Sequence, residues 1–425
     1  IIEDTMIIKL VTSQGRIIGA FGLDTSERFP QKLRVFNNKT IILATGGAGE
    51  VFKINVFPEG MSGDGYALAY EAGAELVNME FIQFGLSSIK TKLALSGSMM
   101  RALPKITNDK GEEFLRNCNI LFAKGASWPI SYEKPSKIID LAVFEERAKG
   151  RKVYLDYREN PQRLNIEKLK KEIKDWYREK GVDFKREKFK RSPLSRLSQI
   201  NPSIIIWFKK RGINLEREKI EIAPAAQHFQ GGVRIGVKAK TNIKGLCAAG
   251  ECAGGQHGAN RPGGNSLLDC QVFGRIAGDT AGGEAKSIKN PKEISRSQIE
   301  ETKKKLQKLL NRRRGLKASL ARNRIRSIMS SLVGIVRTRE GLNKTKRQLE
   351  EMKKKGICMD ENGLVYLLET INILKVAKII ATAASLRDES RGPHLLFDNS
   401  GESEPRNDKK WQRYIVIKKG NGKDE

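Results

Sequence analysis

The segment Gly245–Gly278 constrains the fold more strongly than any other part of the sequence. It reads GLCAAGECAGGQHGANRPGGNSLLDCQVFGRIAG, so a short apolar strand runs into a glycine-rich turn and then into a helix. Strand, glycine turn and helix in this order are typical of a nucleotide-binding α/β domain. Arg261 lies inside the turn, which puts a full positive charge where the backbone bends and can approach a ligand closely.

The N-terminal part of the chain repeats this combination of strands and glycines. Residues 1–44 alternate apolar and polar side chains between turn residues, which predicts a β-meander leading into a buried strand, Thr40–Ala44. That strand ends in TGGAG, where Gly46 and Gly47 leave the backbone open to close approach by a ligand. The stretch SGDGYALAYEAGAEL then predicts a helix that begins near Asp64, with its carboxylate at the helix start.

Glycine content divides the rest of the chain. It falls after residue 80, where charged helical stretches such as NIEKLKKEIKDWYREKG dominate, and it rises again at APAAQHFQGGVRIG. From about residue 290 to 390, apolar residues three and four apart predict three amphipathic helices in a small bundle. The sequence therefore predicts an α/β domain that is split by an inserted α+β domain and followed by a helical bundle. The predicted parts are 1–80 and 223–288 for the α/β domain, 81–222 for the insertion, 289–395 for the bundle and 396–425 for a C-terminal tail.

The chain of 425 residues carries 30 more positive than negative side chains and has an isoelectric point near 9.9. Such a surplus is compatible with nucleic acid, an anionic membrane face, an acidic partner or anionic ligands. It is equally compatible with solvated basic faces of helices, which we favour. The basic runs KLKKEIKDWYREKGVDFKREKFKR and KKKLQKLLNRRR lie outside the glycine-rich blocks, and no nucleic-acid-binding motif accompanies them. We therefore expect no specific nucleic-acid partner.

The cysteines and histidines argue against several kinds of site. The chain has five cysteines without a Cys-x-x-Cys pair and three histidines, so no common zinc pattern can be assembled and we expect no metal site. Scattered cysteines in odd number favour a reducing compartment. No apolar run reaches membrane-spanning length, and no signal peptide is recognisable. We expect a cytoplasmic protein, with peripheral attachment to the cytoplasmic membrane face through partner subunits as the alternative.

Four blocks occur in the order and at the spacing of a known family: ILATGGAG, SGDGYALAYEAGAELVNMEFIQF, the Gly245–Gly278 segment and DESRGPH. Together they resemble the flavoprotein subunits of fumarate reductase and succinate dehydrogenase and the related L-aspartate oxidase. The resemblance extends to about residue 395. It implies FAD as the cofactor, bound by an FAD-binding domain that is accompanied by a mobile capping domain and a helical domain. It also implies a protein partner, namely an iron–sulfur or other electron-transfer subunit.

The resemblance assigns residues to the cofactor. Glu251 matches the carboxylate that contacts the ribitol or ribose hydroxyls, and Asp64 matches an FAD-contacting aspartate. Ser266 and Leu267 match the pair at the isoalloxazine ring, where the positive end of the following helix would stabilise the anion of the reduced flavin. The expected cofactor-binding residues are Gly46, Gly47, Asp64, Glu251, Asn265, Ser266 and Leu267.

The resemblance also assigns residues to the substrate. Arg261 matches the family arginine that clamps a substrate carboxylate bidentately beside the flavin. Gly264 matches a position whose amide meets the substrate, and His257 is expected to orient the turn and to contact the substrate. The family histidine before a Gly-Gly pair has two candidate counterparts in PAAQHFQGG, which are Gln227 by counting and His228 by its aromatic neighbour. We favour His228, as a substrate-binding and catalytic residue.

Several family features are absent from this sequence. The fingerprint G-x-G-x-x-G, which cradles the FAD pyrophosphate in an N-terminal βαβ unit, does not occur, so we expect this unit on another polypeptide or lost by truncation. Gly85 stands where the family has a second carboxylate-binding histidine. Ser136 stands in the slot of the proton-donating arginine. Lys137, Arg101 or Lys105 could replace that donor, a lysine through a pKa lowered by burial, and we select Lys137 as the catalytic candidate.

These patterns support three hypotheses of function. The first is an FAD-dependent oxidoreductase that exchanges hydride between flavin N5 and a small carboxylate held by Arg261. The second is a non-catalytic or electron-relaying flavoprotein subunit, docked to an iron–sulfur partner, whose substrate site has decayed. The third, an anion- or nucleic-acid-binding protein, rests on net charge alone and ranks last.

Overall fold

The computed structural model describes residues 1–26, 32–95, 97–115, 119–126, 136–182 and 187–420. The chain divides into two compact units, which we call unit 1 and unit 2. Unit 1 comprises Ile1–Lys53, Phe57–Ile82 and His228–Glu425, and unit 2 comprises Ile54–Val56 and Gln83–Gln227. Unit 1 is thus interrupted in sequence by unit 2, and the predicted borders of the insertion stay a prediction. The finer division into an α/β domain, a bundle and a tail stays a prediction.

A three-stranded antiparallel meander opens unit 1. Its strands are β1 (Thr5–Ser13), β2 (Arg16–Asp24) and β3 (Leu33–Asn37), paired in the order β1-β2-β3. The hairpin turn between β1 and β2 has positive φ at both of its residues, Gln14 (51°) and Gly15 (73°). Two consecutive positive φ angles match the right-handed twist of the flanking strands, so this two-residue turn sets the register of the meander.

Two short parallel strands form the centre of the predicted cofactor domain. They are β4 (Ile41–Leu43) and β11 (Leu246–Ala248). Each runs into glycine-rich backbone and a short 3₁₀ helix, η1 (Gly49–Val51) after β4 and η2 (Gly250–Cys252) after β11. The long helix α9 (Asn265–Ser287) contacts both strands. The carboxyl ends of both strands therefore carry glycine turns at one edge of the sheet, as the sequence predicts.

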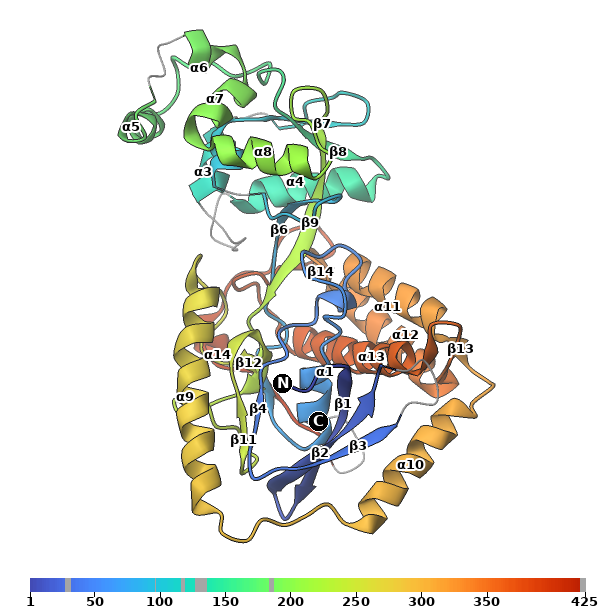
Figure 1. Cartoon of the computed structure of the whole chain (residues 1–425). Helices are drawn as coiled ribbons and strands as arrows, with labels where there is room; N and C mark the ends of the chain where they lie inside the picture. Colours follow the sequence, from blue (N-terminus) through green and yellow to red (C-terminus); the bar gives the residue numbers. More distant parts are fainter. Residues whose placement is uncertain (27–31, 96, 116–118, 127–135, 183–186, 421–425) are drawn as a thin grey trace. The chain divides into compact units, whose positions relative to one another are not determined.

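The C-terminal helices of unit 1 pack around α13 (Gly363–Leu386), which contacts α1 (Asp64–Glu71), α11 (Ala318–Leu332) and α12 (Arg339–Lys355) (Figure 1). Helix α13 is apolar around most of its circumference, which is why it takes the central position. The helix α10 (Arg296–Leu310) begins with a capping box.

The apolar pattern over residues 323–356, NRIRSIMSSLVGIVRTREGLNKTKRQLEEMKKKG, predicts one of the three helices of the bundle, but the structure has two there, α11 and α12. The chain turns between them at Gly334, where an added Cβ would lie 2.6 Å from the carbonyl oxygen of Ser330. The side chain of Thr338 then accepts a hydrogen bond from the amide of Gly341 and caps α12. The break therefore reflects a local stop and start signal that the apolar periodicity does not contain.

Small sheets and a short helix complete unit 1. A four-stranded sheet has the order β12-β10-β5-β17, and two parallel pairs are β13-β15 and β14-β16. Their bounds are β5 (Leu76–Val77), β10 (Gly232–Arg234), β12 (Ala253–Gly254), β13 (Leu316–Lys317), β14 (Arg337–Thr338), β15 (Ile357–Cys358), β16 (Leu396–Phe397), β17 (Val416–Ile417) and helix α14 (Asp408–Trp411).

Unit 2 is built on a four-stranded sheet of order β6-β9-β8-β7 with helices packed around it, so it has the α+β character predicted for the insertion. An aromatic cluster of Phe122, Trp176, Tyr177 and Phe189 lies in its core. The element bounds are β6 (Ile82–Ser88), β7 (Lys105–Asn108), β8 (Val153–Asp156), β9 (Ile220–Phe229), α2 (Ser98–Arg101), α3 (Asn119–Ala126), α4 (Ser136–Ala148), α5 (Lys171–Glu179), α6 (Glu187–Arg191), α7 (Pro193–Ile200) and α8 (Pro202–Lys210).

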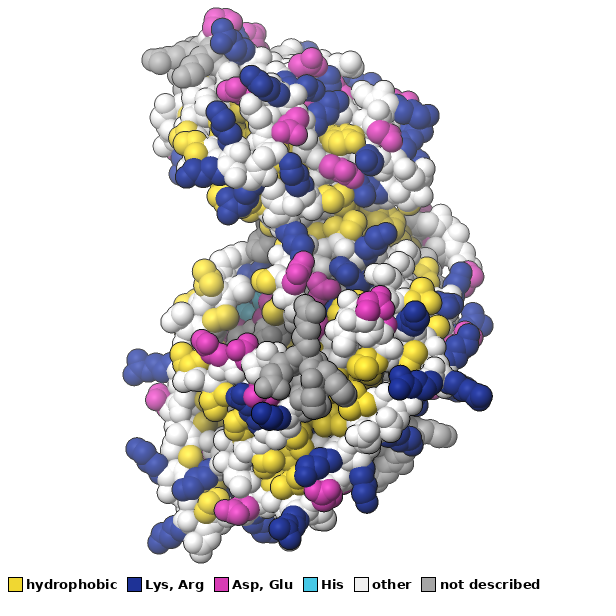
Figure 2. All heavy atoms as spheres, turned by 45° about the vertical axis from the view of Figure 1, so that its right-hand side comes forward, with side chains coloured by type: hydrophobic (Ala, Val, Ile, Leu, Met, Phe, Trp, Pro, Cys, Tyr) yellow, Lys and Arg dark blue, Asp and Glu magenta, His cyan; other side chains and the backbone are white. Residues whose placement is uncertain are grey.

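The charged side chains are spread over the surface. Figure 2 shows Lys and Arg over the whole visible face, with Asp and Glu among them. This distribution fits the interpretation that much of the basic surplus covers solvated faces of helices. Within the part of the chain that the structure describes, no helix is long and apolar enough to cross a membrane.

Candidate functional site

The turn after β4 comes into contact with the turn after β11. Gly46 has a φ of +70°, and an added Cβ there would lie 2.3 Å from the Cε of Met61. At Gly47 an added Cβ would lie 2.5 Å from Oε1 of Glu251. Both positions therefore require glycine, because any larger side chain would displace Met61 or Glu251. The two glycines bring the backbone of this turn next to the Glu251 carboxylate.

Glu251 is fixed by two neighbours, one at its side chain and one at its backbone. Its Oε1 accepts a hydrogen bond of 2.8 Å from the amide of Phe229, and its carbonyl oxygen accepts one of 2.7 Å from the hydroxyl of Tyr66. Burial and the Glu251 charge raise the pKa of Tyr66 well above its usual value, so this hydroxyl stays a donor. The rings of Phe57 and Tyr66 pack against Phe229 with centroid distances of 5.8 and 6.2 Å. This aromatic packing holds the strand end that carries His228.

The predicted histidines His228 and His257 lie together, and each has a carboxylate neighbour. His228 Nδ1 lies 3.5 Å from Glu251 Oε1, and His257 Nε2 lies 3.7 Å from Asp269 Oδ2. The two imidazole rings meet edge to face at a centroid distance of 5.7 Å. Burial, then the charges of His228 and Arg261, lower the pKa of His257 to about 4. His257 is therefore neutral at physiological pH.

Arg261 is 3% exposed and belongs to the same cluster. Its Nη1 donates to the carbonyl oxygen of Pro262 at 3.0 Å, which fixes the guanidinium against the turn. Burial lowers the pKa of Arg261, while the charges of Glu251 and Asp269 act in the opposite direction. The group still carries its charge at neutral pH, because a guanidinium titrates far above it. A buried cation at a glycine-rich turn suits an anionic ligand.

Asp269 is the member of the cluster that the sequence analysis missed. It lies in the first turns of α9 and is 7% exposed, and burial raises its pKa. Its Oδ2 accepts a hydrogen bond of 3.4 Å from Gln256 Nε2. The sequence contains one signal for Asp269. In NSLLD this carboxylate directly follows two leucines, on a helix whose first residues are assigned to the cofactor.

The start of α9 offers a surface for a flat cofactor. Gly264 caps the helix with a φ of +88°, and Asn265, Ser266 and Leu267 form its first turn. The first amides of a helix lack intrahelical partners and carry the positive end of the helix dipole. Leu267 is 79% exposed, an unusual degree for a leucine beside a buried polar cluster. A cofactor ring over this turn would cover the leucine and meet the amides.

Asp64 lies at the start of α1, as predicted, but both of its oxygens already have partners within unit 1. Oδ2 accepts from the hydroxyl of Ser62 at 2.7 Å, and Oδ1 accepts from Nδ2 of Asn372 at 2.7 Å. Asp64 therefore ties α1 to α13. Its predicted contact with FAD stays a prediction.

The substrate-side candidates of unit 2 have mixed surroundings. The side chain of Gln227 donates to the hydroxyl of Ser87 at 2.9 Å and lies 2.8 Å from the position of an added Cβ at Gly85. Gln227 thus fills the space beside Gly85, the position where the family has a histidine. His228 lies with Glu251 in unit 1. Lys137 is in the first turn of α4, and burial lowers its pKa, but its role stays a prediction. The side chain of Ser136 lies outside the described residues.

The two other candidate proton donors are engaged within unit 2. The guanidinium of Arg101 lies over the ring of Trp176, 4.3 Å from its centroid. Lys105 pairs with Glu159 at 3.1 Å and Glu113 at 3.5 Å, and these partners raise its pKa against the effect of burial. These contacts indicate structural roles for both side chains.

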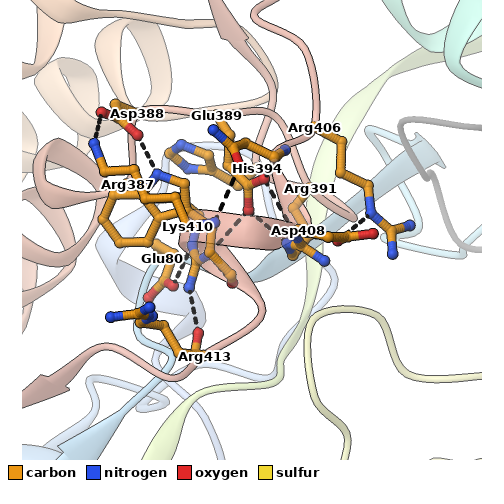
Figure 3. A network of polar contacts seen from close by, with 12 residues as sticks. Glu80, Arg387, Asp388, Glu389, Arg391, His394, Arg406, Asp408, Lys410 and Arg413 are labelled. Atoms are coloured by element: carbon orange, nitrogen blue, oxygen red, sulfur yellow. Dashed lines mark hydrogen bonds and ion pairs between the residues drawn. The ribbon is translucent and has the colours of Figure 1, made fainter.

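The DESRGPH block, residues 388–394, and Arg387 before it belong to a charged network (Figure 3). Arg387 is fully buried and donates to Glu80 Oε1 at 2.9 Å and to Glu389 Oε1 at 3.1 Å. Gly392 adopts a φ of +54°, and an added Cβ there would lie 2.6 Å from the carbonyl oxygen of Ala259. The block therefore packs directly on the backbone two residues before Arg261.

A second contact holds the same turn. The hydroxyl of Tyr414 donates to the carbonyl oxygen of Gly255 at 2.9 Å. The network connects this part of the chain to the DESRGPH block, because Arg387 Nη2 donates to the carbonyl oxygen of Arg413 at 3.1 Å. Tyr414 therefore contacts the turn before His257, at Gly255, and Gly392 contacts it after His257, at Ala259.

Comparison with known proteins gives consistent matches. The family model described as FAD binding domain matches residues 1–267, and the one described as fumarate reductase flavoprotein C-term matches residues 322–425. An uncharacterized FAD-dependent oxidoreductase of Methanocaldococcus jannaschii is 32% identical, over 98% of this chain and 70% of its own length. The fumarate reductase flavoprotein subunit of Escherichia coli is 28% identical, over 93% of this chain and 64% of its own length.

A solved structure agrees with these sequence matches. Mycobacterium smegmatis Sdh1, in complex with UQ1, superposes with a TM-score of 0.77 at 26% identity, over 99% of this chain and 65% of that chain. This chain therefore spans about two thirds of the length of the proteins that it matches.

Among the described residues, no group of three or more His, Cys, Asp or Glu side chains could hold a metal ion.

Proposed function

This chain belongs to the flavoprotein-subunit family of fumarate reductase and succinate dehydrogenase, a family of FAD-dependent oxidoreductases, and from that premise we propose that it exchanges hydride between FAD and a small carboxylate. The observation that supports this most is that Arg261 is buried and interacts electrostatically with His257 and Glu251, which both neighbour His228. The polar cluster and the cofactor-side turns meet at a single place in unit 1.

The residues of unit 1 fit the flavin half of FAD. Gly46 and Gly47 let the turn after β4 pack closely against Met61 and Glu251, Glu251 supplies a carboxylate for sugar hydroxyls, and the first turn of α9 supplies amides. Bound FAD would supply a hydride-accepting or hydride-donating ring. The protein would stabilise negative charge on that ring with the positive end of α9, a contribution of about 0.3–1 kcal/mol for an exposed helix end.

Arg261 would hold the substrate. Its planar guanidinium can grip one carboxylate with two parallel hydrogen bonds, and its burial strengthens them by excluding water. The amide of Gly264 and the neutral imidazole of His257 would complete the contacts, and His228 could carry a proton between substrate and Glu251. Lys137 is the alternative proton donor.

A second candidate function is that of an electron-relaying flavoprotein subunit with an iron–sulfur partner. The departures Gly85 and Ser136 favour it, because they remove two family substrate contacts.

Turnover separates the two candidates. We expect the flavin-loaded protein to oxidise or reduce at least one member of a panel of small carboxylates with a dye as electron acceptor or donor. Flavin that is reduced by the dye but by no carboxylate would favour the relay.

We also propose that a βαβ segment carrying the pyrophosphate-binding fingerprint packs beside β4. Among the described residues, β4 pairs with β11 alone, and parallel sheets are normally wider and covered on both faces. A groove of about 420 Å³ lies along β4 and the meander, and Ile42 is 40% exposed there. Its apolar lining includes Ile7, Leu10 and Phe36. Such a groove suits the apolar face of a helix or strand.

This proposal predicts that the 425-residue chain binds FAD weakly or not at all by itself. A separately expressed N-terminal βαβ segment from one of the matched relatives should restore binding in trans, because it supplies the missing phosphate cradle. FAD fluorescence titrations of the chain with and without the segment measure this. Tight retention of FAD by the chain alone would show that its own residues cradle the pyrophosphate.

A further inference from the structure

A second pocket lies at the edge of the sheet opposite the cofactor residues. Strands β4 and β11 are parallel, so their carboxyl ends carry the Gly46 and Glu251 turns and their amino ends lie together at the other edge. A pocket of about 320 Å³ opens there. It is lined by Ser13, Gln14, Arg16, Ile17, Ile18, Asn38, Lys39, Lys244, Ile288, Asn290, Pro291 and Lys292.

The lining carries positive charge without any acidic side chain. Its charged members are Arg16, Lys39, Lys244 and Lys292. Arg16 pairs with Glu284 outside the lining at 2.8 Å, and Lys292 donates to Gln14 Oε1 at 2.7 Å. The negative end of α9, which stops at Ser287, adds about half a negative charge. Glu284 and this helix end together offset about one and a half of the positive charges and leave an excess of more than two.

Two of the cations have no counter-charge. In the described parts of the chain, the side chains of Lys39 and Lys244 make no hydrogen bond and no ion pair, and both are exposed to solvent at the pocket. Lysines with spare donors that face one hollow repel each other, and a bound anion would relieve this repulsion.

The backbone that carries these side chains is held by hydrogen bonds. The amide of Lys244 donates to the carbonyl oxygen of Gly15 at 3.1 Å, and its carbonyl accepts from the amide of Ile17 at 2.9 Å. The amide of Asn38 donates to the carbonyl oxygen of Ile18 at 3.0 Å. The hairpin, the turn before β4 and the turn before β11 are therefore one hydrogen-bonded assembly. Because the backbone under the cations is already fixed, anion binding has to order only their side chains.

We propose that this pocket binds the phosphate groups of a free oligophosphate, such as inorganic pyrophosphate or a nucleoside triphosphate. The excess positive charge matches a multiply charged oxyanion, and Ser13, Asn38 and Asn290 add hydrogen-bonding groups. The hollow is concave and small, which suits a compact anion. A nucleic-acid duplex or a bilayer would instead need an extended basic face.

The test is calorimetric titration of the full chain with inorganic pyrophosphate at 0.15 M salt, where weak surface charges are largely screened. We expect saturable binding of one pyrophosphate per chain. The double variant Lys39→Gln/Lys244→Gln should bind at least about tenfold more weakly, since it removes two charge-assisted contacts. Thermal melting should be almost unchanged, because both side chains are exposed and, within the described parts of the chain, neither makes a hydrogen bond or an ion pair.

The matched control is Lys354→Gln/Lys355→Gln, which removes the same charge from the exposed end of α12. It should bind pyrophosphate like the unmodified chain. Three results would each overturn the proposal. These are no saturable binding by the unmodified chain, equal weakening in both double variants, and binding to phosphatidylglycerol vesicles without binding to pyrophosphate.

Discussion

Replacing Arg387 by methionine is expected to lower the free energy of unfolding by about 3–5 kcal/mol, the usual cost of removing one partner from a buried ion pair. The side chains of Arg387 and its partner Glu80 have no solvent exposure, and that of the neighbouring Glu389 is 1% exposed. Its guanidinium also donates to the carbonyl oxygens of Trp411 and Arg413. The substitution would therefore leave the buried Glu80 carboxylate without its ion-pair partner and two carbonyl oxygens without this donor, a loss that urea denaturation can measure.

The control for this prediction is Arg339→Met. Arg339 pairs with Glu404 at 3.0 Å, but its side chain is 57% exposed, so water replaces the lost contact. We expect a loss below about 1 kcal/mol. Equal losses for the two substitutions would mean that the network around Arg387 does not carry the stability we assign to it.

The second large effect concerns turnover. Arg261→Lys keeps the positive charge and loses the two-point grip on a carboxylate, which costs about 1.5–3 kcal/mol in transition-state stabilisation. We expect kcat/KM to fall by about one to two orders of magnitude, with flavin content almost unchanged. If Arg261 only stabilised its turn, the variant would melt early and yet keep its efficiency per folded molecule. Steady-state kinetics, flavin absorbance and the melting temperature of one variant separate these results.

The family and the mixed α/β architecture could be predicted from the sequence because they depend on local signals. Glycine turns after apolar strands and a helix start are set by neighbouring residues. Gly46 and Gly47 illustrate this, since two glycines directly after an apolar strand predict a turn without reference to the rest of the fold. The clustering of His228, His257, Glu251 and Arg261 followed from the family resemblance, and the structure brings these residues together in unit 1.

Features that depend on distant pairing could not be predicted. Glu80 and Arg387 are 307 residues apart in the chain, and the residues around each of them do not predict that the two pair in the core. The DESRGPH block carries part of the family resemblance but has no predicted role, whereas in the structure it packs against the Arg261 turn. Asp269 was missed for a similar reason, because its partner His257 lies on a turn whose path the sequence does not specify.

Charge on its own was a poor guide to function. Lys105 and Arg101 resembled available proton donors in the sequence, yet an acidic pair and a tryptophan ring engage them. A shared site of Lys39 and Lys244 could not be predicted, because the two residues lie far apart in the sequence and outside the basic runs. Only the parallel pairing of β4 and β11 brings them to the same edge.

The most direct test of the proposed role of Arg261 is a titration with malonate, followed through the visible absorption of the flavin. The protein titrated is the chain loaded with FAD in the presence of the separately expressed βαβ segment. A carboxylate held beside the ring should change the flavin spectrum saturably, and Arg261→Lys should weaken this response about tenfold or more. Arg275→Lys is the matched control, because Arg275 lies on α9 with its side chain 87% exposed, and it should respond like the unmodified protein. Identical titrations of the unmodified protein and Arg261→Lys would contradict the assignment of Arg261 as the carboxylate clamp.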